Sequence, residues 1–328
     1  MSRILILSRH IESTSFRQRI TLYFDSLKQA DVEYHVESLP SETYKTLKLF
    51  GSASAFDVVF LHKKRLSLLE RFFLRKNAKK IIYDFDDAVM FDPANPQKPH
   101  GKKFKKFAAT VKMADKIIAG NSYLADFAKK INNNTVVLPT GLDISEYEVE
   151  KNRLDGKIRL VWIGTGSNLI YLKQISETLE QIGSGYKEVV LRIICNEFFD
   201  LANMPVEKIQ WSLENQVRNL VNSDIGLAPL PDDNFTKGKC GFKILQYAAA
   251  SLPVVASPVG VNAELVRDGI NGFIAENSQQ WSDGIRRLIE SPELRRKMGQ
   301  AAKKTSKDYD VSILGRKFID IILSTISR

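Results

Sequence analysis

Short apolar segments alternate with amphipathic helical segments along this chain, and this pattern restricts its fold more than any other feature. In the first half, six segments have the length and apolar content of buried strands: Ile4–Leu7, Tyr34–Glu37, Val58–His62, Lys80–Tyr83, Lys116–Ala119 and Thr135–Leu138. Helices are expected between them at Ser15–Gln29, Leu66–Arg75, Lys102–Met113 and Ser122–Lys130. Strands that alternate with helices predict a parallel sheet covered by helices, which is a Rossmann-like unit.

The alternation starts again after residues 145–157, a polar stretch with the composition of a linker. Strands are expected in the second half at Arg159–Ile163, Val189–Ile194, Ile209–Trp211, Ile225–Ala228, Pro253–Ala256 and Gly272–Ala275. Helices are expected at Leu169–Ile182, Leu213–Asn222 and Phe242–Ala250, and over 279–290, 293–307 and 312–327. We therefore predict an α/β protein with two Rossmann-like domains, 1–150 and 151–311, that face a ligand-binding cleft. The helix at 312–328 follows the second domain.

Composition places the chain among soluble globular proteins. It has 328 residues, enough for two domains, of which 44% are hydrophobic and 26% are charged. The apolar run near the start, Ile4–Leu7, is too short for a signal peptide, and no run approaches the roughly 18 residues of a membrane span. Cys195 and Cys240 are far apart without metal-ligand spacing, so we expect no metal site and a cytoplasmic location.

The net charge of +10 is concentrated in residues 62–106, which include HKKR at 62–65 and KKFKK at 102–106. A basic surface attracts phosphates, nucleic acid or anionic lipid without choosing among them. No zinc-ligand or RNA-recognition signature accompanies the charge, so nucleic acid is not expected as a partner. Two interpretations remain open: solvated helix faces, or a surface that docks on the inner face of an anionic membrane.

Glycine turns flank a helix and an apolar strand near the end of the second half. Gly238 and Gly241 precede the expected helix Phe242–Ala250, and Lys239 and Lys243 lie at its start. A helix N-terminus presents free N–H groups and positive dipole, to which lysines add full charges, so it suits a phosphate. Within a strand–helix alternation, this predicts a nucleotide-type ligand at the edge of a parallel sheet.

This segment resembles the donor-binding region of family-4 (group 1) glycosyltransferases, which have the GT-B fold. The matching residues are Leu252-Pro253-Val254-Val255-Ala256-Ser257 and Asp268-Gly269-Ile270-Asn271-Gly272-Phe273. Three further segments, 115–124, 136–143 and 221–230, resemble family motifs and occur in the family's order. In the family the last helix crosses back to the first domain, so the resemblance implies that the helix at 312–328 does so here.

The resemblance implies an enzyme that moves a sugar from a nucleoside diphosphate sugar to a glycan or lipid-linked acceptor, in cell-surface polysaccharide synthesis. Retention of anomeric configuration is likewise implied by the resemblance, and neither a metal nor another cofactor is expected. The family has two glutamates in the donor region, one at the transferred sugar and one at the ribose; here Gly238 and Gln246 stand at those positions. Gln246 can still hydrogen-bond a ribose, whereas Gly238 has no carboxylate. Two alternatives stay open: a nucleotide-sugar epimerase of the same fold, and a catalytically inactive GT-B module that binds a glycan or a protein.

Donor binding is expected at two places in the second domain. The turn made by Gly164, Thr165, Gly166 and Ser167 follows the first strand, where a glycine-rich turn lets backbone N–H groups approach a phosphate. The other place comprises Lys239, Cys240, Gly241, Lys243 and Gln246. Its N–H groups and lysines would stabilise the departing diphosphate. For the lysines, a solvated helix start is the alternative.

An acidic sequence, Asp84-Phe85-Asp86-Asp87, follows the expected strand at 80–83. A haloacid-dehalogenase-type phosphatase requires Thr or Val where Ala88 stands, and a D-x-D metal site belongs to the single-sheet glycosyltransferase fold. The remaining interpretations are a loop stabilised by helix capping and a cleft loop in which Asp86 or Asp87 binds acceptor hydroxyls or acts as a base. His62 ends a strand that should face the same cleft, and is either a further catalytic residue or a structural one.

Arg9, Arg17 and Arg19 follow the first strand, and Arg9 and Arg17 are candidates for binding an acceptor or donor phosphate. Ser13-Thr14-Ser15 offers an N-cap for the next helix, with Gln18, three residues after Ser15, as a capping-box partner. Arg17 then lies in the first turn, where a cation opposes the helix dipole, and an anionic ligand would offset this repulsion.

Overall fold

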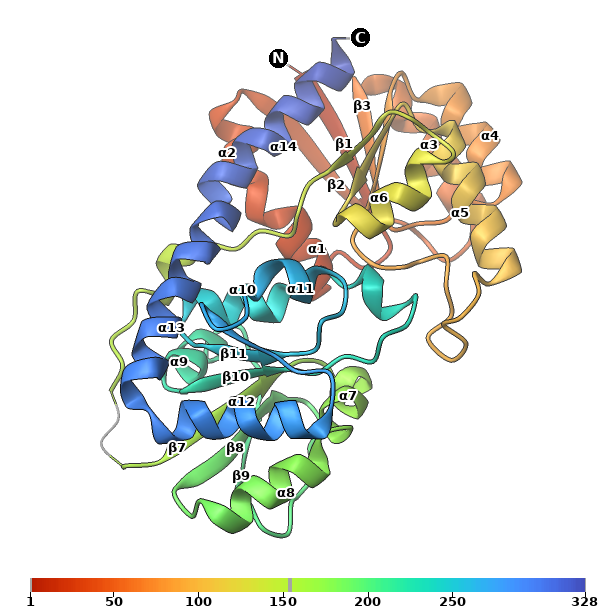
Figure 1. The fold of residues 1–328 in the computed structure, drawn as a ribbon. Helices are drawn as coiled ribbons and strands as arrows, with labels where there is room; N and C mark the ends of the chain where they lie inside the picture. Colours follow the sequence, from red (N-terminus) through yellow and green to blue (C-terminus); the bar gives the residue numbers. More distant parts are fainter. Residues whose placement is uncertain (1, 153–154, 328) are drawn as a thin grey trace. The chain divides into compact units, whose positions relative to one another are not determined.

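The computed structural model describes residues 2–152 and 155–327, and the chain packs into two compact units (Figure 1). The first unit consists of Met1–Leu142, Asp233–Cys240 and Val311–Arg328. The second consists of Asp143–Asp232 and Gly241–Asp310. Within the expected linker, residues 153–154 lie outside the described residues.

The first unit is built on a six-stranded parallel sheet in the order β2-β1-β3-β4-β5-β6. Its strands are β1 (Ser2–Ser8), β2 (Val32–Ser38), β3 (Val58–His62), β4 (Ile81–Phe85), β5 (Lys116–Ala119) and β6 (Thr135–Val137). Every residue of β3 and β4 is buried, as expected for central strands covered by helices on both faces.

The α-helices of this unit are α1 (Thr14–Arg19), α2 (Phe24–Gln29), α3 (Thr43–Gly51), α4 (Leu68–Asn77), α5 (Gly101–Met113), α6 (Ser122–Lys129) and α14 (Val311–Ile326). Short 3₁₀ helices are η1 (Thr21–Tyr23), η2 (Ser52–Ala55) and η5 (Thr236–Gly238). Although α14 is last in the sequence, it packs along α2 (Figure 1), and its Phe318 ring stacks on Tyr23 with centroids 4.8 Å apart. The C-terminal helix therefore completes the first unit.

The second unit is built on another six-stranded parallel sheet, in the order β12-β11-β10-β7-β8-β9. Its strands are β7 (Ile158–Ile163), β8 (Val189–Cys195), β9 (Val206–Gln210), β10 (Ile225–Ala228), β11 (Val254–Ala256) and β12 (Gly272–Ile274). A separate hydrophobic core surrounds Trp162 of β7. The predicted pair of Rossmann-like α/β units is confirmed.

The α-helices of the second unit are α7 (Leu169–Lys173), α8 (Ser176–Gly185), α9 (Gln216–Val221), α10 (Phe242–Ala249), α11 (Val261–Leu265), α12 (Ser278–Glu290) and α13 (Pro292–Ser306). The 3₁₀ helices are η3 (Ile144–Tyr147), η4 (Gly166–Asn168) and η6 (Lys307–Tyr309). Across both units, none of the described helices has the length and apolarity that crossing a membrane requires.

Two helices that were expected to be continuous are broken. The segment Ser15–Gln29 forms α1, η1 and α2, because the buried Ile20 leaves the helical region at φ −134° and ends α1. The segment Leu169–Ile182 forms α7 and α8, with the break at 174–175. Helices α3 and α11 were not predicted. The α3 sequence mixes polar and apolar residues, and it buries Phe50 against the core.

Candidate functional site

Polar side chains of the first unit meet at the carboxyl edge of its sheet, where β1, β3 and β4 end near one another. In open parallel sheets, ligands bind at this edge, where the strand order reverses. Here it reverses at β1, which pairs with β2 on one side and with β3 on the other. The side chains that form this polar cluster are Ser15, Arg19, His62, Lys63, Asp84, Asp86 and Asp87.

Asp84 lies in the buried part of the cluster. Strand β4 runs two residues further than expected, so Asp84 is part of the strand and not of the loop after it. Its carboxylate pairs with the Arg19 guanidinium and accepts a hydrogen bond from His62 Nδ1 at 2.8 Å. Burial alone would raise the pKa of Asp84, but the Arg19 charge and the His62 hydrogen bond outweigh it and lower that pKa. Asp84 is therefore ionised, and the Nε2 atom of His62 faces Ser15.

The predicted carboxylates Asp86 and Asp87 lie beside His62 in this cluster, joined by a lysine. Lys63 Nζ is 2.6 Å from Asp86 Oδ1 and 2.6 Å from Asp87 Oδ2. The Asp86 side chain is 12% exposed and that of Asp87 is 37% exposed. Burial opposes ionisation of Asp86, but Lys63, His62 and Arg19 outweigh it and hold its pKa below the usual range. Lys63 has a φ of +56°, which is uncommon for residues other than glycine. In this conformation its side chain reaches both carboxylates.

The segment Asp233–Cys240 packs on residues 86–88 of the first unit, the acidic loop that follows β4. Cys240 Sγ lies 3.0 Å from the Asp86 carbonyl oxygen, and burial raises the pKa of this thiol. Lys239 Nζ is 3.5 Å from Asp87 Oδ1. The backbone carbonyl of Lys239 accepts a hydrogen bond from Asn121 Nδ2 at 3.1 Å. Two residues predicted at the donor site, Lys239 and Cys240, therefore lie beside the predicted catalytic carboxylates.

Gly238 is the residue that replaces the first glutamate of the family pattern. A Cβ atom at this position would lie 2.6 Å from Ala88 Cβ and 2.9 Å from Ala88 N. Real Cβ atoms essentially never approach so closely, so any side chain would displace the acidic loop. The glycine is therefore explained by the tight packing of its segment on Ala88.

The predicted phosphate turn of the second unit follows β7. The Gly164 N–H donates to the Ile194 carbonyl at 3.1 Å, and the Gly166 N–H donates to Asn196 Oδ1 at 2.9 Å. These two N–H groups are thus hydrogen-bonded within the protein, in contrast to the expected free donors. A Cβ on Gly166 would lie 2.3 Å from Glu197 Oε1, which is the end of an exposed and flexible side chain that can move aside. The hydroxyls of Thr165 and Ser167 are hydrogen-bonded to each other at 3.1 Å.

Helix α10 brings Lys243 to this turn. The helix begins after Gly241, whose φ of +65° favours glycine. Lys243 Nζ lies 4.4 Å from the centroid of the Trp162 ring, in cation–π geometry. The same ammonium would be 3.2 Å from a Cβ on Gly164, so Lys243 and the predicted turn are adjacent. Gln246 is buried one turn further on.

The amide of Gln246 is hydrogen-bonded inside the second unit. Its Nε2 donates to Gln216 Oε1 at 3.3 Å, and a side-chain hydrogen bond joins it to Tyr147. Contact with a ribose would therefore require these partners to rearrange.

Several predicted residues are not brought together as expected. Lys239 belongs to the first unit and Lys243 to the second, so the start of α10 does not hold both lysines. Arg9 is exposed and lies outside the polar cluster, and Arg17 is half-buried in α1. Within the predicted N-cap segment 13–15, Ser13 caps α1 by accepting from the Phe16 N–H at 3.2 Å, so the capping box expected between Ser15 and Gln18 is wrong.

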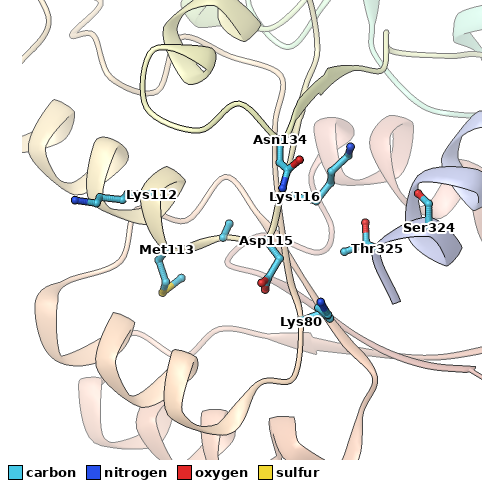
Figure 2. A pocket seen from close by; sticks show the side chains of 9 residues that line it. Lys80, Lys112, Met113, Asp115, Lys116, Asn134, Ser324 and Thr325 are labelled. Carbon is cyan, nitrogen blue, oxygen red and sulfur yellow. The ribbon is translucent and has the colours of Figure 1, made fainter. Parts of the chain in front are cut away.

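A cavity of about 340 Å³ lies at the opposite, amino-terminal edge of the first sheet (Figure 2). It is lined by Lys80, Lys112, Met113, Ala114, Asp115, Lys116, Asn134, Ser324 and Thr325. Its carboxylate, Asp115, pairs with Arg75 at 2.6 Å. None of the predicted site residues lines it. Over the described ranges, 2–152 and 155–327, no group of three or more His, Cys, Asp or Glu residues is arranged to hold a metal ion.

The sequence over residues 212–305 matches the family model for glycosyl transferases, group 1. An uncharacterised glycosyltransferase from Methanocaldococcus jannaschii is 26% identical over 221 residues, which are 64% of this chain and 59% of that protein. The match thus spans about three fifths of the relative's length.

Similar folds occur among solved structures. Sucrose-phosphate synthase from Thermosynechococcus elongatus gives a TM-score of 0.77 at 12% identity, with 100% of each chain covered. Anabaena HepE, solved in complex with UDP and glucose, gives a TM-score of 0.73 at 14% identity, covering 99% of this chain and 100% of that one. These similarities confirm the GT-B fold, and together with the family match they confirm the resemblance to group 1 glycosyltransferases.

Proposed function

We propose that the protein is a glycosyltransferase that moves a sugar from a nucleoside diphosphate sugar to a hydroxyl of a glycan or lipid-linked acceptor. The observation that carries this proposal is the group 1 match over 212–305, which includes α10 with Lys243 and Gln246. A role in cell-surface polysaccharide synthesis at the cytoplasmic face of the membrane is part of the same proposal.

The second unit would bind the donor. Lys243 lies beside the 164–167 turn, where its ammonium would neutralise the diphosphate as the sugar–phosphate bond breaks. HepE was solved with UDP, which supports a uridine nucleotide as the first donor to test. The reaction would need no metal, because fixed positive charge stabilises the leaving group.

The first unit would bind the acceptor. Its cluster combines two carboxylates that accept hydrogen bonds with Lys63 and His62, which donate them, and this mixture suits a sugar hydroxyl. Asp86 or Asp87 would take the proton of the attacking hydroxyl.

Replacing Lys243 with alanine is expected to weaken UDP binding roughly 10- to 100-fold, because a hydrogen bond to a charged group contributes about 1.5–3 kcal/mol. Uridine should bind almost unchanged, since it has no phosphate. Isothermal titration with both ligands measures the difference. Lys208→Ala is the matched control, because Lys208 pairs with Asp200 on the surface of the same unit. A loss of affinity that is equal for uridine and UDP would remove Lys243 from the phosphate site.

Incubation with a panel of nucleotide sugars separates the proposed activity from its alternatives. Slow release of free nucleoside diphosphate without an acceptor supports a transferase. Conversion of one nucleotide sugar into its epimer supports an epimerase of the same fold, and absence of any nucleotide binding supports an inactive module.

Helix α4 carries the surface that we propose docks on an anionic membrane. Leu68 and Phe72 are 76% and 61% exposed there, and Lys76 is exposed one turn further along. Neighbouring α5 adds exposed Lys102, Lys105 and Lys106. Exposed apolar side chains beside basic ones fit the headgroup region of an anionic leaflet.

Replacing Phe72 with serine is expected to weaken binding to anionic vesicles roughly 10- to 100-fold, because burying such a side chain contributes about 1.5–3 kcal/mol. Co-sedimentation measures this binding, which should also fall as salt rises. Ile170→Ser is the control, since Ile170 is equally exposed, at 61%, on the second unit. Equal binding to neutral and anionic vesicles would contradict the docking proposal.

A further inference from the structure

The hydroxyl of Ser15 has three polar neighbours and is not the cap of its helix. Ser15 Oγ lies 2.9 Å from Asp86 Oδ2, 2.9 Å from Lys63 Nζ and 3.3 Å from His62 Nε2. Since Ser13 caps α1, the Ser15 hydroxyl is available to the polar cluster.

The valence of a hydroxyl restricts where the protons of this group can lie. A serine hydroxyl has one proton to donate and two lone pairs that accept. The Lys63 ammonium can only donate, so it occupies one lone pair. The contacts with Asp86 and His62 must therefore use the proton and the other lone pair. Ser15 either donates to Asp86 and accepts from His62, or accepts from Asp86 and donates to His62.

Both orders satisfy every contact. When Asp86 is ionised, Ser15 donates to it, and a protonated His62 Nε2 donates to Ser15. When Asp86 holds the proton, it donates to Ser15, and Ser15 donates to the lone pair of His62 Nε2. In both, His62 Nδ1–H donates to Asp84, which Arg19 keeps ionised. The two arrangements differ by one proton moved along two hydrogen bonds, and no heavy atom has to move.

We infer that Ser15 is a relay and positioning residue that joins Asp86 to His62, so that the two act as one acid–base pair. This inference rests on the proposed transfer to an acceptor hydroxyl. The acceptor O–H bond breaks while its oxygen forms the bond to the sugar, and the proton goes to Asp86. Asp86 passes a proton to Ser15 as the proton of Ser15 goes to His62 Nε2. Because His62 is buried, the proton later returns through Ser15 to Asp86, the more exposed end of the relay, and leaves from there to solvent. The nucleoside diphosphate leaves with the electron pair of the sugar–phosphate bond.

Charged side chains surround the His62 ring on both sides. The charged and titratable side chains that surround the ring are Asp84 and Arg19 on the Nδ1 side and Lys63, Asp86 and Asp87 on the Nε2 side, with Lys239 and Cys240 beyond them. The neutral ring is the form that accepts a proton.

Ser15→Ala is expected to lower kcat roughly 100-fold, at the low end of what a positioned acid or base contributes, with little change in the KM for the acceptor. The pH–rate profile should change shape, because Asp86 alone then takes the proton. Ser15→Thr keeps a hydroxyl and should restore both rate and profile. Ser13→Ala is the control that removes the cap from the same helix and should leave the profile in place.

A second measurement does not depend on turnover. NMR follows the titration of His62 in the wild type, Ser15→Ala, Asp86→Asn and the double variant. In the wild-type background, Asp86→Asn should shift the midpoint of the His62 titration. In the Ser15→Ala background, the same substitution should shift that midpoint by less than half as much. Additive shifts, or a Ser15→Thr variant as slow as Ser15→Ala, would overturn the relay. Coupled titrations in a protein that transfers no sugar would support the relay and count against the proposed function.

Discussion

Replacing Arg19 with methionine is expected to lower the unfolding free energy of the first unit by about 3–5 kcal/mol, because removal of one partner leaves a buried charge uncompensated. The charge is that of Asp84, which is fully buried and paired with Arg19. All three tryptophans lie in the second unit, so their fluorescence does not report this loss. Hydrogen exchange of peptides from β1 and β3 in urea measures it.

The control for this variant is Arg286→Met, which removes an exposed pair with Glu290 at 3.9 Å and should change stability by at most about 1 kcal/mol. Asp84→Asn added to Arg19→Met should recover part of the loss, since the unpaired charge is gone. If Arg19→Met alone costs no more than the control, Asp84 is not held ionised by Arg19.

The same ion pair sets a direction for acid sensitivity. The folded pKa of Asp84 is lowered because Arg19 and His62 outweigh its burial, so this group stabilises the fold above its unfolded pKa. That contribution is lost as the pH falls through the lowered folded pKa. The wild type should therefore lose stability on acidification more steeply than the Arg19→Met/Asp84→Asn variant does.

Replacing Asp86 with asparagine is expected to lower the rate of sugar transfer by a factor of about 10²–10⁴, which is the usual contribution of a general base. The amide keeps the shape of the side chain but takes up no proton. The Kd for UDP should stay within about twofold of the wild type, because Asp86 belongs to the first unit and Lys243 to the second. Single-turnover kinetics and calorimetry together measure both quantities.

A matched control for Asp86→Asn is Asp92→Asn, which removes a lysine-paired carboxylate of the same unit outside the cluster. It should transfer sugar at close to the wild-type rate. A collapse of UDP affinity in a folded Asp86→Asn variant would show that the acceptor assignment is wrong.

Strands were predictable here because each is a short apolar run between polar segments. The bounds expected for β3 and β5, Val58–His62 and Lys116–Ala119, are those of the structure. The break of the first helix was not predictable from periodicity, because the apolar positions Phe16, Ile20 and Tyr23 continue at helical spacing through it. Local conformation at Ile20 is set by tertiary packing, which overrides such a pattern.

Part of the polar cluster could be foreseen, because the carboxyl ends of neighbouring parallel strands must meet. His62 and the Asp86–Asp87 pair were found in this way. Ser15, Arg19 and Lys63 were not predicted to belong to the cluster. Arg19 lies between Phe16 and Tyr23 on the buried side of its segment, and a charge at such a position needs a buried partner. Lys63 depends on a backbone conformation that no side-chain pattern reveals.

Lys239 and Cys240 were predicted at the donor site because residues 238–246 have the sequence of one continuous loop and helix. The chain instead changes units between Cys240 and Gly241, so neighbours in sequence belong to different cores. Spacing along a helix cannot reveal such a division, because both halves of the segment have ordinary loop and helix composition.

The position of α14 has a consequence for how the protein is made. A chain leaves the ribosome in order, and domains commonly fold as they emerge. The β1–β6 sheet is synthesised early, but Phe318, which covers Tyr23 and lies 5.5 Å from the ring of Phe60, is synthesised after the whole second unit. The second unit can therefore be complete while Tyr23 and Phe60 of the nascent first unit still lack their apolar cover, which is added once Phe318 has been synthesised.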